Sequence, residues 1–258
     1  MIIGVTCFGD KEKIVLSAEY RHLEGKIGNF RGFFGMQGEL LYAGRNCLKL
    51  YEIDSYKLVV KKYRTAKLTQ ILSLFKKSKA RKSFYNGIKL CELNINTPQP
   101  VAYMEIKSMW GFVKESYYIC RYIPHSAIGE CYGDETNFVQ DVITDFAKFA
   151  AMLHERGVIH KDLNSTNVRF ERNGADNTVF WLIDINRMKF APNGKPFDFK
   201  TSFKNLTRFS CNSPMFEFFV RHYLKARNID EKLVTEALLI KETHDKRVDF
   251  KKKIKQML

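Results

Sequence analysis

Four polar residues have the chemical types and the order along the chain that phosphoryl transfer requires. Asp162 lies in the run HKDLNSTN (160–167), where a carboxylate can orient the hydroxyl that accepts a phosphoryl group. Asn167 and Asp184 carry the oxygen ligands that Mg²⁺ prefers. Lys61 ends the apolar run 58–60 and can reach the phosphates of a nucleotide. Together these residues predict a chain that uses ATP and Mg²⁺.

The order of the segments supports this chemistry more than any single residue does. An isolated aspartate or asparagine in a loop is usually a turn or cap residue, and a lysine at a strand end is usually solvated. Here the lysine is followed by a helix, two strands, a long helix, the pattern HxDxxxxN, a short hairpin and an aspartate. Strand alternation places Lys62 on the opposite face from Lys61, so we select Lys61.

Three further positions have two interpretations each. His160 is a general base or, as we favour, an architectural residue that orients the loop by hydrogen bonds. Arg187 contacts a phosphate or the catalytic loop, or forms a structural pair. Gly44, Arg45 and Asn46 offer backbone N–H groups and one guanidinium to phosphates, or form an ordinary hairpin turn, because no GxGxxG loop is present.

The first half of the sequence predicts mostly strands. The runs 40–43, 47–53 and 57–63 are apolar, β-branched or aromatic, and turn residues separate them. A helix is expected at 78–93, and the run NTPQP (96–100) ends it. Two more strands are expected at 101–106 and 116–122, before a connector at 123–126.

The second half predicts mostly helices. Residues 135–156 carry a continuous apolar stripe, and Gly157 fits the end of that helix. Short strands are expected at 168–170 and 179–183 around a turn at 172–177, with helices in the remainder. The fold class is therefore α+β: a strand-rich lobe (1–122) with one helix and a helical lobe (123–258), which together form a single domain.

The composition narrows the environment of the protein. The chain has 258 residues, of which 45% are hydrophobic, enough to bury a substantial core. No eighteen-residue apolar run and no secretory leader are apparent, so we expect a cytoplasmic protein. The six cysteines form no CxxC pair, and no HExxH pattern occurs, so neither a disulfide framework nor a zinc site is indicated.

A net charge of +15 indicates an anionic partner. Residues 61–82 hold nine lysines and arginines, and residues 241–258 hold seven. A C-terminal helix with apolar residues among these lysines can lie peripherally on an anionic inner-membrane surface. The alternative, slightly favoured, is a helix that docks on the protein and has a solvated basic face. No nucleic-acid-binding motif is present, so no nucleic acid is expected.

Four motifs resemble those of the lipopolysaccharide core kinases of the Kdo/WaaP family. They are LVVK (58–61), NTPQPVAYME (96–105), HKDL (160–163) with Asn167, and LIDINRM (182–188). The resemblance covers roughly residues 40–210 and implies a two-lobed protein-kinase-like fold. It implies ATP-dependent phosphorylation of Kdo or heptose in a lipid A-linked core glycan. Lys61 would contact the ATP phosphates, Asp162 would be the catalytic aspartate, and Asn167 and Asp184 would hold Mg²⁺.

One departure from kinase-like enzymes keeps alternatives open. These enzymes pair the strand lysine with a helix glutamate, but the helix predicted at 78–93 has only Glu92, near its end. The chain could therefore be a nucleotide-binding pseudokinase scaffold. A second alternative is an atypical RIO-like serine protein kinase that uses its basic surface in a larger assembly. The sequence does not name the acceptor sugar.

Overall fold

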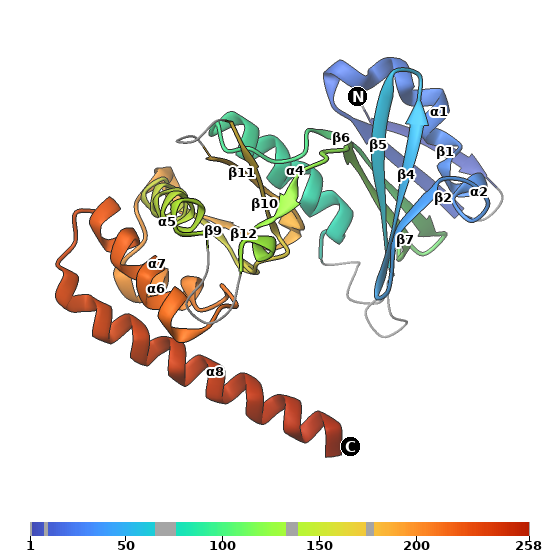
Figure 1. Cartoon of the computed structure of the whole chain (residues 1–258). Helices are drawn as coiled ribbons and strands as arrows, with labels where there is room; N and C mark the ends of the chain where they lie inside the picture. The colour runs from blue at the N-terminus through green and yellow to red at the C-terminus, as the bar shows by residue number, and fades with distance from the viewer. Residues whose placement is uncertain (1, 8–9, 65–75, 133–138, 174–177, 258) are drawn as a thin grey trace. The chain divides into compact units, whose positions relative to one another are not determined.

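The computed structural model describes residues 2–7, 10–64, 76–132, 139–173 and 178–257, and the chain forms two compact units. The first unit comprises Met1–Pro124 and the second His125–Leu258. Figure 1 shows strands gathered in the first unit and helices in the second. Each unit is described by itself.

The first unit is built on a seven-stranded antiparallel sheet with the strand order β1-β2-β6-β7-β5-β4-β3. Neighbouring strands in the sequence form hairpins, except where β6 and β7 lie between β2 and β5. The strands are β1 (Ile2–Cys7), β2 (Asp10–Leu16), β3 (Glu39–Ala43), β4 (Asn46–Ile53), β5 (Tyr56–Tyr63), β6 (Pro100–Ser108) and β7 (Val113–Arg121).

Helical segments cover both faces of this sheet. The short segments η1 (Ala18–Leu23), α1 (Glu24–Gly28) and α2 (Phe30–Phe33) pack on the face that carries Leu58 and Val60. The longer α4 (Lys79–Glu92) packs on the other face. Ser78 begins α4, because its hydroxyl accepts a hydrogen bond from the backbone N–H of Arg81 at 3.0 Å. Both faces of β6 are therefore buried.

The five strands and the helix predicted for this unit are confirmed, with ends shifted by at most a few residues. The sequence reasoning did not predict β1, β2 or the short helices before residue 38. β2 begins with the charged residues Asp10 to Lys13, and only its last three residues, 14–16, are buried. Such a strand lacks the alternation that identifies a half-buried strand.

The second unit is a helical body with two small sheets. Its α-helices are α5 (Gln140–Glu155), α6 (Phe199–Leu206), α7 (Ser213–Ala226) and α8 (Val234–Met257). Outside them lie the 3-10 segments η2 (Ile128–Cys131), η3 (Ile185–Arg187), η4 (Pro192–Gly194) and η5 (Glu231–Leu233). One sheet has the order β11 (Thr178–Leu182), β10 (Val168–Arg172), β8 (Ser126–Ala127), and the other pairs β12 (Met188–Phe190) with β9 (Val158–His160).

The apolar stripe predicted on the long helix is the centre of this unit. Phe146 on α5 packs against Phe219 on α7 and against Phe209, with ring centroids 5.2 and 5.0 Å apart. The helix begins at Gln140, and the predicted start at 135–138 lies outside the described residues, as do positions 174–177 of the predicted turn. The strands β8, β9 and β12 were not predicted, because two- and three-residue strands carry no readable pattern.

Gly157 ends α5 as predicted. Its φ of +67° lies in the left-handed region, where a residue with a Cβ is strained. A Cβ at this position would also come within 2.7 Å of the carbonyl oxygen of Lys195. The sharp turn at Gly157 directs the chain from α5 into β9, which ends at His160.

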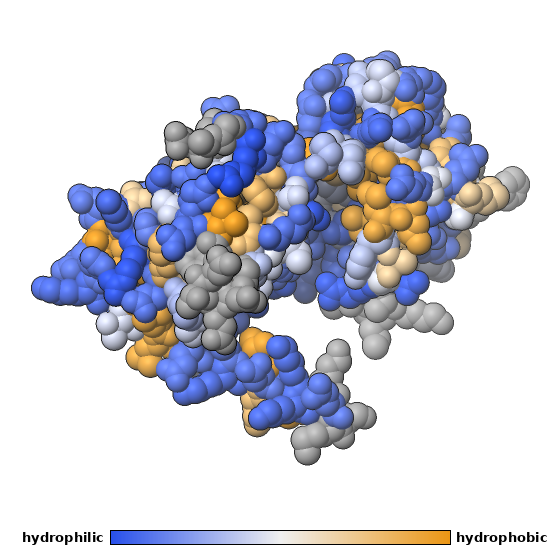
Figure 2. Space-filling model, in the orientation of Figure 1, coloured by the Kyte–Doolittle hydropathy of each residue, from blue (hydrophilic) through white to orange (hydrophobic). Residues whose placement is uncertain are grey.

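The C-terminal helix α8 has two different halves. Val234, Ala237 and Lys241 in its first half are buried against the helical body. Its last turns are exposed, including Phe250 and Ile254, which are 65% and 42% exposed. In Figure 2 the surface of α8 is largely hydrophilic with small hydrophobic patches. Within the described residues, no helix has the length and apolar character needed to cross a membrane.

Candidate active site

The loop that carries Asp162 is anchored at its start by the small β9–β12 sheet. His160 pairs with Met188, and the backbone N–H of Lys161 donates to the carbonyl of Arg187 at 3.1 Å. These contacts join the loop to the segment that follows Asp184. The two stretches of sequence that were predicted to share a site are therefore adjacent.

Asn164 closes the loop into a compact turn. Its side-chain Oδ1 accepts hydrogen bonds from the backbone N–H groups of Thr166 and Asn167, each at 3.0 Å. The side chain of Asn167 then donates from Nδ2 to the carbonyl of Asp162 at 2.9 Å. Asn167, five positions after Asp162, is thereby held beside it.

Asn167 and Asp184 are neighbours through a backbone hydrogen bond. The N–H of Ile183 donates to the carbonyl of Asn167 at 2.9 Å, so the next residue, Asp184, lies beside the loop. Asp184 has a φ of +53°, in the left-handed region. A non-glycine residue in that region costs free energy and is a frequent feature of functional sites. Asn186 Nδ2 donates to Asp184 Oδ1 at 2.7 Å and orients the carboxylate.

These two side chains fit a magnesium ion that keeps several other ligands. They offer one amide oxygen and one carboxylate, both hard oxygen donors, and Mg²⁺ in phosphotransferases is completed by water and substrate phosphates. Asn167 uses Nδ2 in the loop, and the described residues make no hydrogen bond to its Oδ1. Among those residues no cluster of three or more His, Cys, Asp or Glu side chains exists that would favour a different metal.

His160 connects the two halves of this site. Its side chain is buried, its Nδ1 accepts from the backbone N–H of Asp162 at 3.2 Å, and its Nε2 lies 2.9 Å from the carbonyl oxygen of Ile183. Because a backbone N–H can only donate, the ring proton is on Nε2 and donates to Ile183. Burial lowers the pKa of His160, which keeps the ring neutral. This geometry supports the architectural interpretation.

Arg187 lies at the end of η3, three residues after Asp184. Its side chain is exposed, and its contact with the loop is made by its backbone carbonyl. The structural contact therefore belongs to the main chain, and the guanidinium is accessible to solvent.

In the first unit, Lys61 lies in the middle of the sheet on β5. It pairs with Leu48 on β4 and Tyr118 on β7, and its Nζ lies 5.1 Å from the centre of the Tyr63 ring. Tyr63 and Tyr118 belong to the apolar cluster under α4, so Lys61 shares the face covered by that helix.

Lys62 lies on the opposite face, as strand alternation predicts. Its Nζ forms an ion pair with Glu115 at 2.9 Å and lies 5.8 Å from the centre of the Phe34 ring, which belongs to the cluster on that face. The two adjacent lysines therefore have different surroundings.

Sequence reasoning did not identify the apolar side chains beside Lys61. Leu48 and Leu50 on β4, and Val59 on β5, share the face of Lys61 and are half-buried. Figure 2 shows hydrophobic surface over this part of the sheet. The alternation of side chains along the two paired strands could have predicted that they share this face. Such a surface suits the flat, apolar face of a nucleotide base.

A buried acid also occupies the face of Lys61. Glu105 on β6 is aligned with Ser116 and Tyr63, in the row next to that of Lys61, and is 2% exposed. It accepts a hydrogen bond from the hydroxyl of Ser78 at 2.6 Å, so it ties the start of α4 to the sheet. Within α4 the only acidic residue is Glu92, at the end of the helix, as the sequence indicated.

The hairpin between β3 and β4 contains the predicted phosphate-binding turn. The N–H of Gly44 donates to the carbonyl of Asn46 at 3.0 Å, which closes the turn. A Cβ on Gly44 would overlap the outer end of the Tyr42 ring, an exposed side chain that would have to move aside. Arg45 is exposed, and Asn46 has a buried Oδ1 without a hydrogen-bond partner among the described residues.

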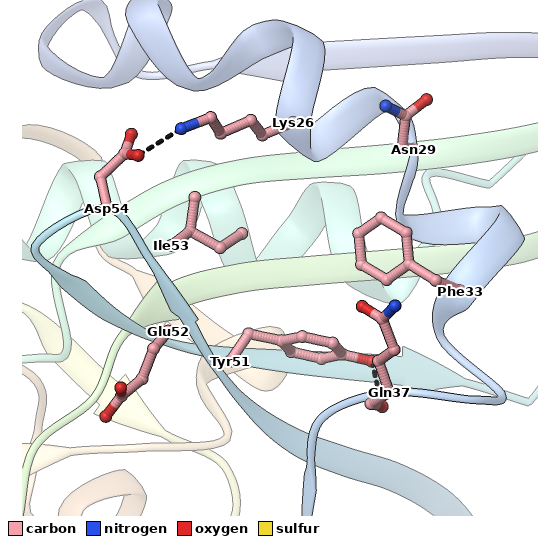
Figure 3. Close-up of a pocket in the computed structure, with 8 residues that line it drawn as sticks. All are labelled: Lys26, Asn29, Phe33, Gln37, Tyr51, Glu52, Ile53 and Asp54. Atoms are coloured by element: carbon pink, nitrogen blue, oxygen red, sulfur yellow. Dashed lines mark hydrogen bonds and ion pairs between the residues drawn. The ribbon is translucent and has the colours of Figure 1, made fainter.

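A pocket of about 330 Å³ opens in the first unit, on the face opposite Lys61 (Figure 3). Tyr51 lies at its floor and is three residues from Leu48, the cross-strand partner of Lys61, so the two point to opposite faces. Its lining residues are Lys26, Asn29, Phe33, Gln37, Tyr51, Glu52, Ile53 and Asp54. This pocket is therefore separate from the surface beside Lys61.

Comparison with solved structures shows the fold. A structure described as "WaaP in complex with acyl carrier protein" is similar, with a TM-score of 0.60 and 17% sequence identity over 90% of this chain and 98% of that chain. The present chain shares its α+β arrangement, with an antiparallel sheet in the N-terminal part and helices in the C-terminal part. This likeness shows the fold of the chain.

The particular family follows from the sequence comparison. The model of the lipopolysaccharide kinase (Kdo/WaaP) family matches residues 47–250, and the chain belongs to this family. None of the curated proteins matches it. The resemblance drawn from the sequence motifs is therefore confirmed, as is the interpretation of the chain as a phosphotransferase.

Proposed function

We propose that this protein transfers the γ-phosphoryl group of ATP to a sugar hydroxyl, of Kdo or heptose, in the inner core of lipopolysaccharide. The single observation that carries the proposal is the set of hydrogen bonds that holds Asn167 beside Asp162 and joins their loop to the segment that carries Asp184. Family membership supports the lipopolysaccharide core as acceptor.

Within this proposal each candidate site residue of the helical unit has one role. Asp162 orients the acceptor hydroxyl and receives its proton as the bond to phosphorus forms. Asn167 Oδ1 and the Asp184 carboxylate hold Mg²⁺, which supplies positive charge to the phosphates. His160 keeps the backbone of Asp162 at a fixed place relative to Ile183.

The first unit supplies the nucleotide contacts in the same proposal. Lys61 binds the α- and β-phosphates, and the half-buried surface formed by Leu48, Leu50 and Val59 receives the base. Arg45, exposed at the tip of the β3–β4 hairpin, adds a positive charge for the phosphates. The two units, strand-rich and helical, are thus the two lobes of one kinase domain.

A panel of acceptors tests the function. Purified protein with ATP and Mg²⁺ is offered inner-core oligosaccharide, a seryl peptide mixture, or no acceptor, and phosphate incorporation is measured in each. We expect incorporation into the oligosaccharide that disappears when EDTA removes the metal. Incorporation into peptide alone would support the RIO-like alternative. Nucleotide binding without turnover on any acceptor would support the pseudokinase alternative.

We further propose that the exposed end of α8 contacts an anionic lipid surface. Six basic residues and one acidic residue lie between 246 and 255. Phe250 and Ile254, one helical turn apart, are exposed among them. Each lysine near an anionic bilayer contributes about 1 kcal/mol, and exposed apolar side chains enter the interface. A lipid-linked acceptor would make this contact useful, because it holds the enzyme near its substrate.

Vesicle sedimentation tests this contact. We expect binding to vesicles of phosphatidylethanolamine with phosphatidylglycerol and none to vesicles of phosphatidylcholine alone. Charge reversal at Lys251, Lys252 and Lys253 should abolish it, whereas reversal at the exposed Lys57 and Lys148 should not. Equal binding to both vesicle types would contradict the proposal.

A further inference from the structure

A buried chain of hydrogen bonds runs from α7 to the catalytic loop through four side chains that have no role in the site described above. Arg227 Nη1 lies 2.7 Å from the hydroxyl of Tyr223, and that hydroxyl lies 2.8 Å from Nδ1 of His154. His154 Nε2 lies 3.0 Å from Oδ1 of Asn205, and Asn205 Nδ2 lies 2.8 Å from the carbonyl oxygen of His160.

This chain of hydrogen bonds has a defined donor-to-acceptor direction. Arg227 can only donate, so the oxygen of Tyr223 accepts from it and the hydroxyl proton is directed to His154 Nδ1. The proton of the neutral His154 ring is then on Nε2 and donates to Asn205 Oδ1. The amide nitrogen of Asn205 donates in turn to the carbonyl of His160. An amide oxygen can only accept, so Asn205 Oδ1 requires the ring proton on Nε2 of His154, and Nδ1 is left to accept from Tyr223.

Burial enforces the neutral state that this direction needs. The side chains of His154 and Tyr223 are fully buried, and that of Asn205 is 6% exposed. Burial lowers the pKa of His154 to about 4, so its ring carries one proton at neutral pH. A charged ring would carry a second N–H on Nδ1, pointing at the hydroxyl of Tyr223, and burial disfavours that charge.

Both ends of the chain are fixed. At one end Arg227 also donates to Ser202 Oγ and to the carbonyl of Phe197, each at 3.1 Å, and pairs with Glu155. At the other end, Asn205 donates a hydrogen bond to the backbone carbonyl of His160. The ring of His160 contacts the N–H of Asp162 and the carbonyl of Ile183.

We propose that His154 and Asn205 are positioning residues for phosphoryl transfer, because they fix the backbone of His160 and thereby the place of Asp162. This inference rests on the proposed kinase function for its kinetic consequence. In addition to the β9–β12 contacts, Asn205 on α6 ties the start of the loop to His154 on α5. Displacement of a reacting group by about 1 Å can lower turnover by about a hundredfold.

The tautomers of the two histidines test the chain directly in the wild-type protein. We expect the nitrogen-15 spectrum of the imidazoles to show both His154 and His160 as neutral rings protonated on Nε2. His154 should not titrate between pH 8 and 5.5. A ring protonated on Nδ1 at His154, or titration near pH 6.5, would overturn the proposal. This measurement does not depend on the acceptor or on activity.

Substitutions at Asn205 test the kinetic consequence. Asn205→Asp keeps an acceptor for His154 but loses the donor to His160, and we expect kcat to fall by about tenfold or more. Nucleotide affinity should change by less than about threefold, since the effect is on the loop. His154→Gln retains one acceptor and one donor, so it should keep more of the wild-type kcat than His154→Leu.

A matched control separates positioning from loss of stability. Phe219→Leu removes buried aromatic packing between α7 and α5 without touching the chain, so it should lower the melting temperature and leave kcat per folded molecule unchanged. Equal kcat in Asn205→Asp and wild type would overturn the proposal.

If the Asn205 variants do not fold, Tyr223→Phe, which removes one hydroxyl, decides the question. If the hydrogen bonds position the loop as proposed, that variant should show a lowered kcat and a changed nitrogen-15 signal at His154. If both were unchanged, the proposal would be contradicted. Failure of the proposed function is distinguishable, because the wild-type protein would then transfer no phosphate while the tautomer measurement still gives its own result.

Discussion

The two units of the molecule hold their candidate functional residues in different ways. In the helical unit, Asp162, Asn167 and Asp184 lie in irregular backbone whose position is fixed by side-chain and main-chain hydrogen bonds. In the strand unit, Lys61 lies on a regular strand, and its position follows from the register of β5 with its neighbours. A loop needs specific polar partners, whereas a sheet places a side chain by alternation alone.

This difference predicts how sensitive each unit is to substitution. In the helical unit, substitution of a site residue should lower activity strongly, and the size of the loss should depend on which functional group is removed, since each side chain has one role. In the strand unit two adjacent lysines with opposite orientations offer a direct test of whether face or charge matters.

The largest effect is expected at Asp162. Asp162→Ala removes the group that orients the acceptor hydroxyl, and kcat should fall by about a thousandfold or more. Steady-state phosphate transfer to core oligosaccharide measures it, and circular dichroism checks that the variant is folded. A folded variant with more than a tenth of the wild-type rate would show that this carboxylate is not the catalytic group.

A smaller effect is expected from Lys61→Met. Loss of the phosphate contact should reduce kcat/KM for ATP by about tenfold to a hundredfold. Lys62→Met is the matched control, because Lys62 lies on the other face and pairs with Glu115. That variant should stay within about threefold of wild type. Equal losses in both variants would mean that general positive charge, and not the face of the strand, is responsible.

The stability of the helical unit should depend on pH through His154. Its pKa is about 4 in the folded protein and about 6.5 when unfolded, so protons favour the unfolded chain as pH falls from 6.5 toward 4. The stability that the neutral His154 contributes is therefore fully present above pH 6.5 and is lost as the pH falls below it. Between pH 7 and 5 the wild type should lose about 2 kcal/mol more than His154→Gln, measured by urea unfolding at each pH. Parallel curves for the two proteins would rule out this contribution.

The smallest effect is expected at the hairpin tip. Arg45 is exposed, and an exposed charge contributes on the order of 1 kcal/mol or less to phosphate binding. Arg45→Ala should raise KM for ATP by about twofold to fivefold and leave kcat unchanged, and the effect should shrink at high salt. No change at low salt would favour the ordinary hairpin turn over the phosphate-binding interpretation.

The parts of the fold that the sequence predicted are those with a strong local signal. The alternating runs of β4 and β5, the stripe of α5 and the turn at Gly157 are all recognisable from residue type and spacing. The strand β2 was missed because its charged first half hides the alternation. The three-residue strand β12 is defined by its partner β9, which no local pattern reveals.

The candidate site divides in the same way. The motif at 160–167 and Asp184 were identified from spacing, and the structure joins them through the bond between Ile183 and Asn167. The hydrogen-bonded chain through His154 and Asn205 could not be predicted, because its members lie 51 residues apart and meet only when α6 packs near α5. The buried Glu105 was likewise invisible, since its burial depends on the packing of α4.

The proposed activity on which the kinetic predictions rest is phosphoryl transfer from ATP to the lipopolysaccharide core. Mass spectrometry of inner-core oligosaccharide after incubation with ATP and Mg²⁺ tests this directly, with Asp162→Ala as the paired sample. We predict a mass increase of one phosphate with the wild-type protein and none with the variant. An unmodified oligosaccharide with both proteins, or the same modification with both, would contradict the account.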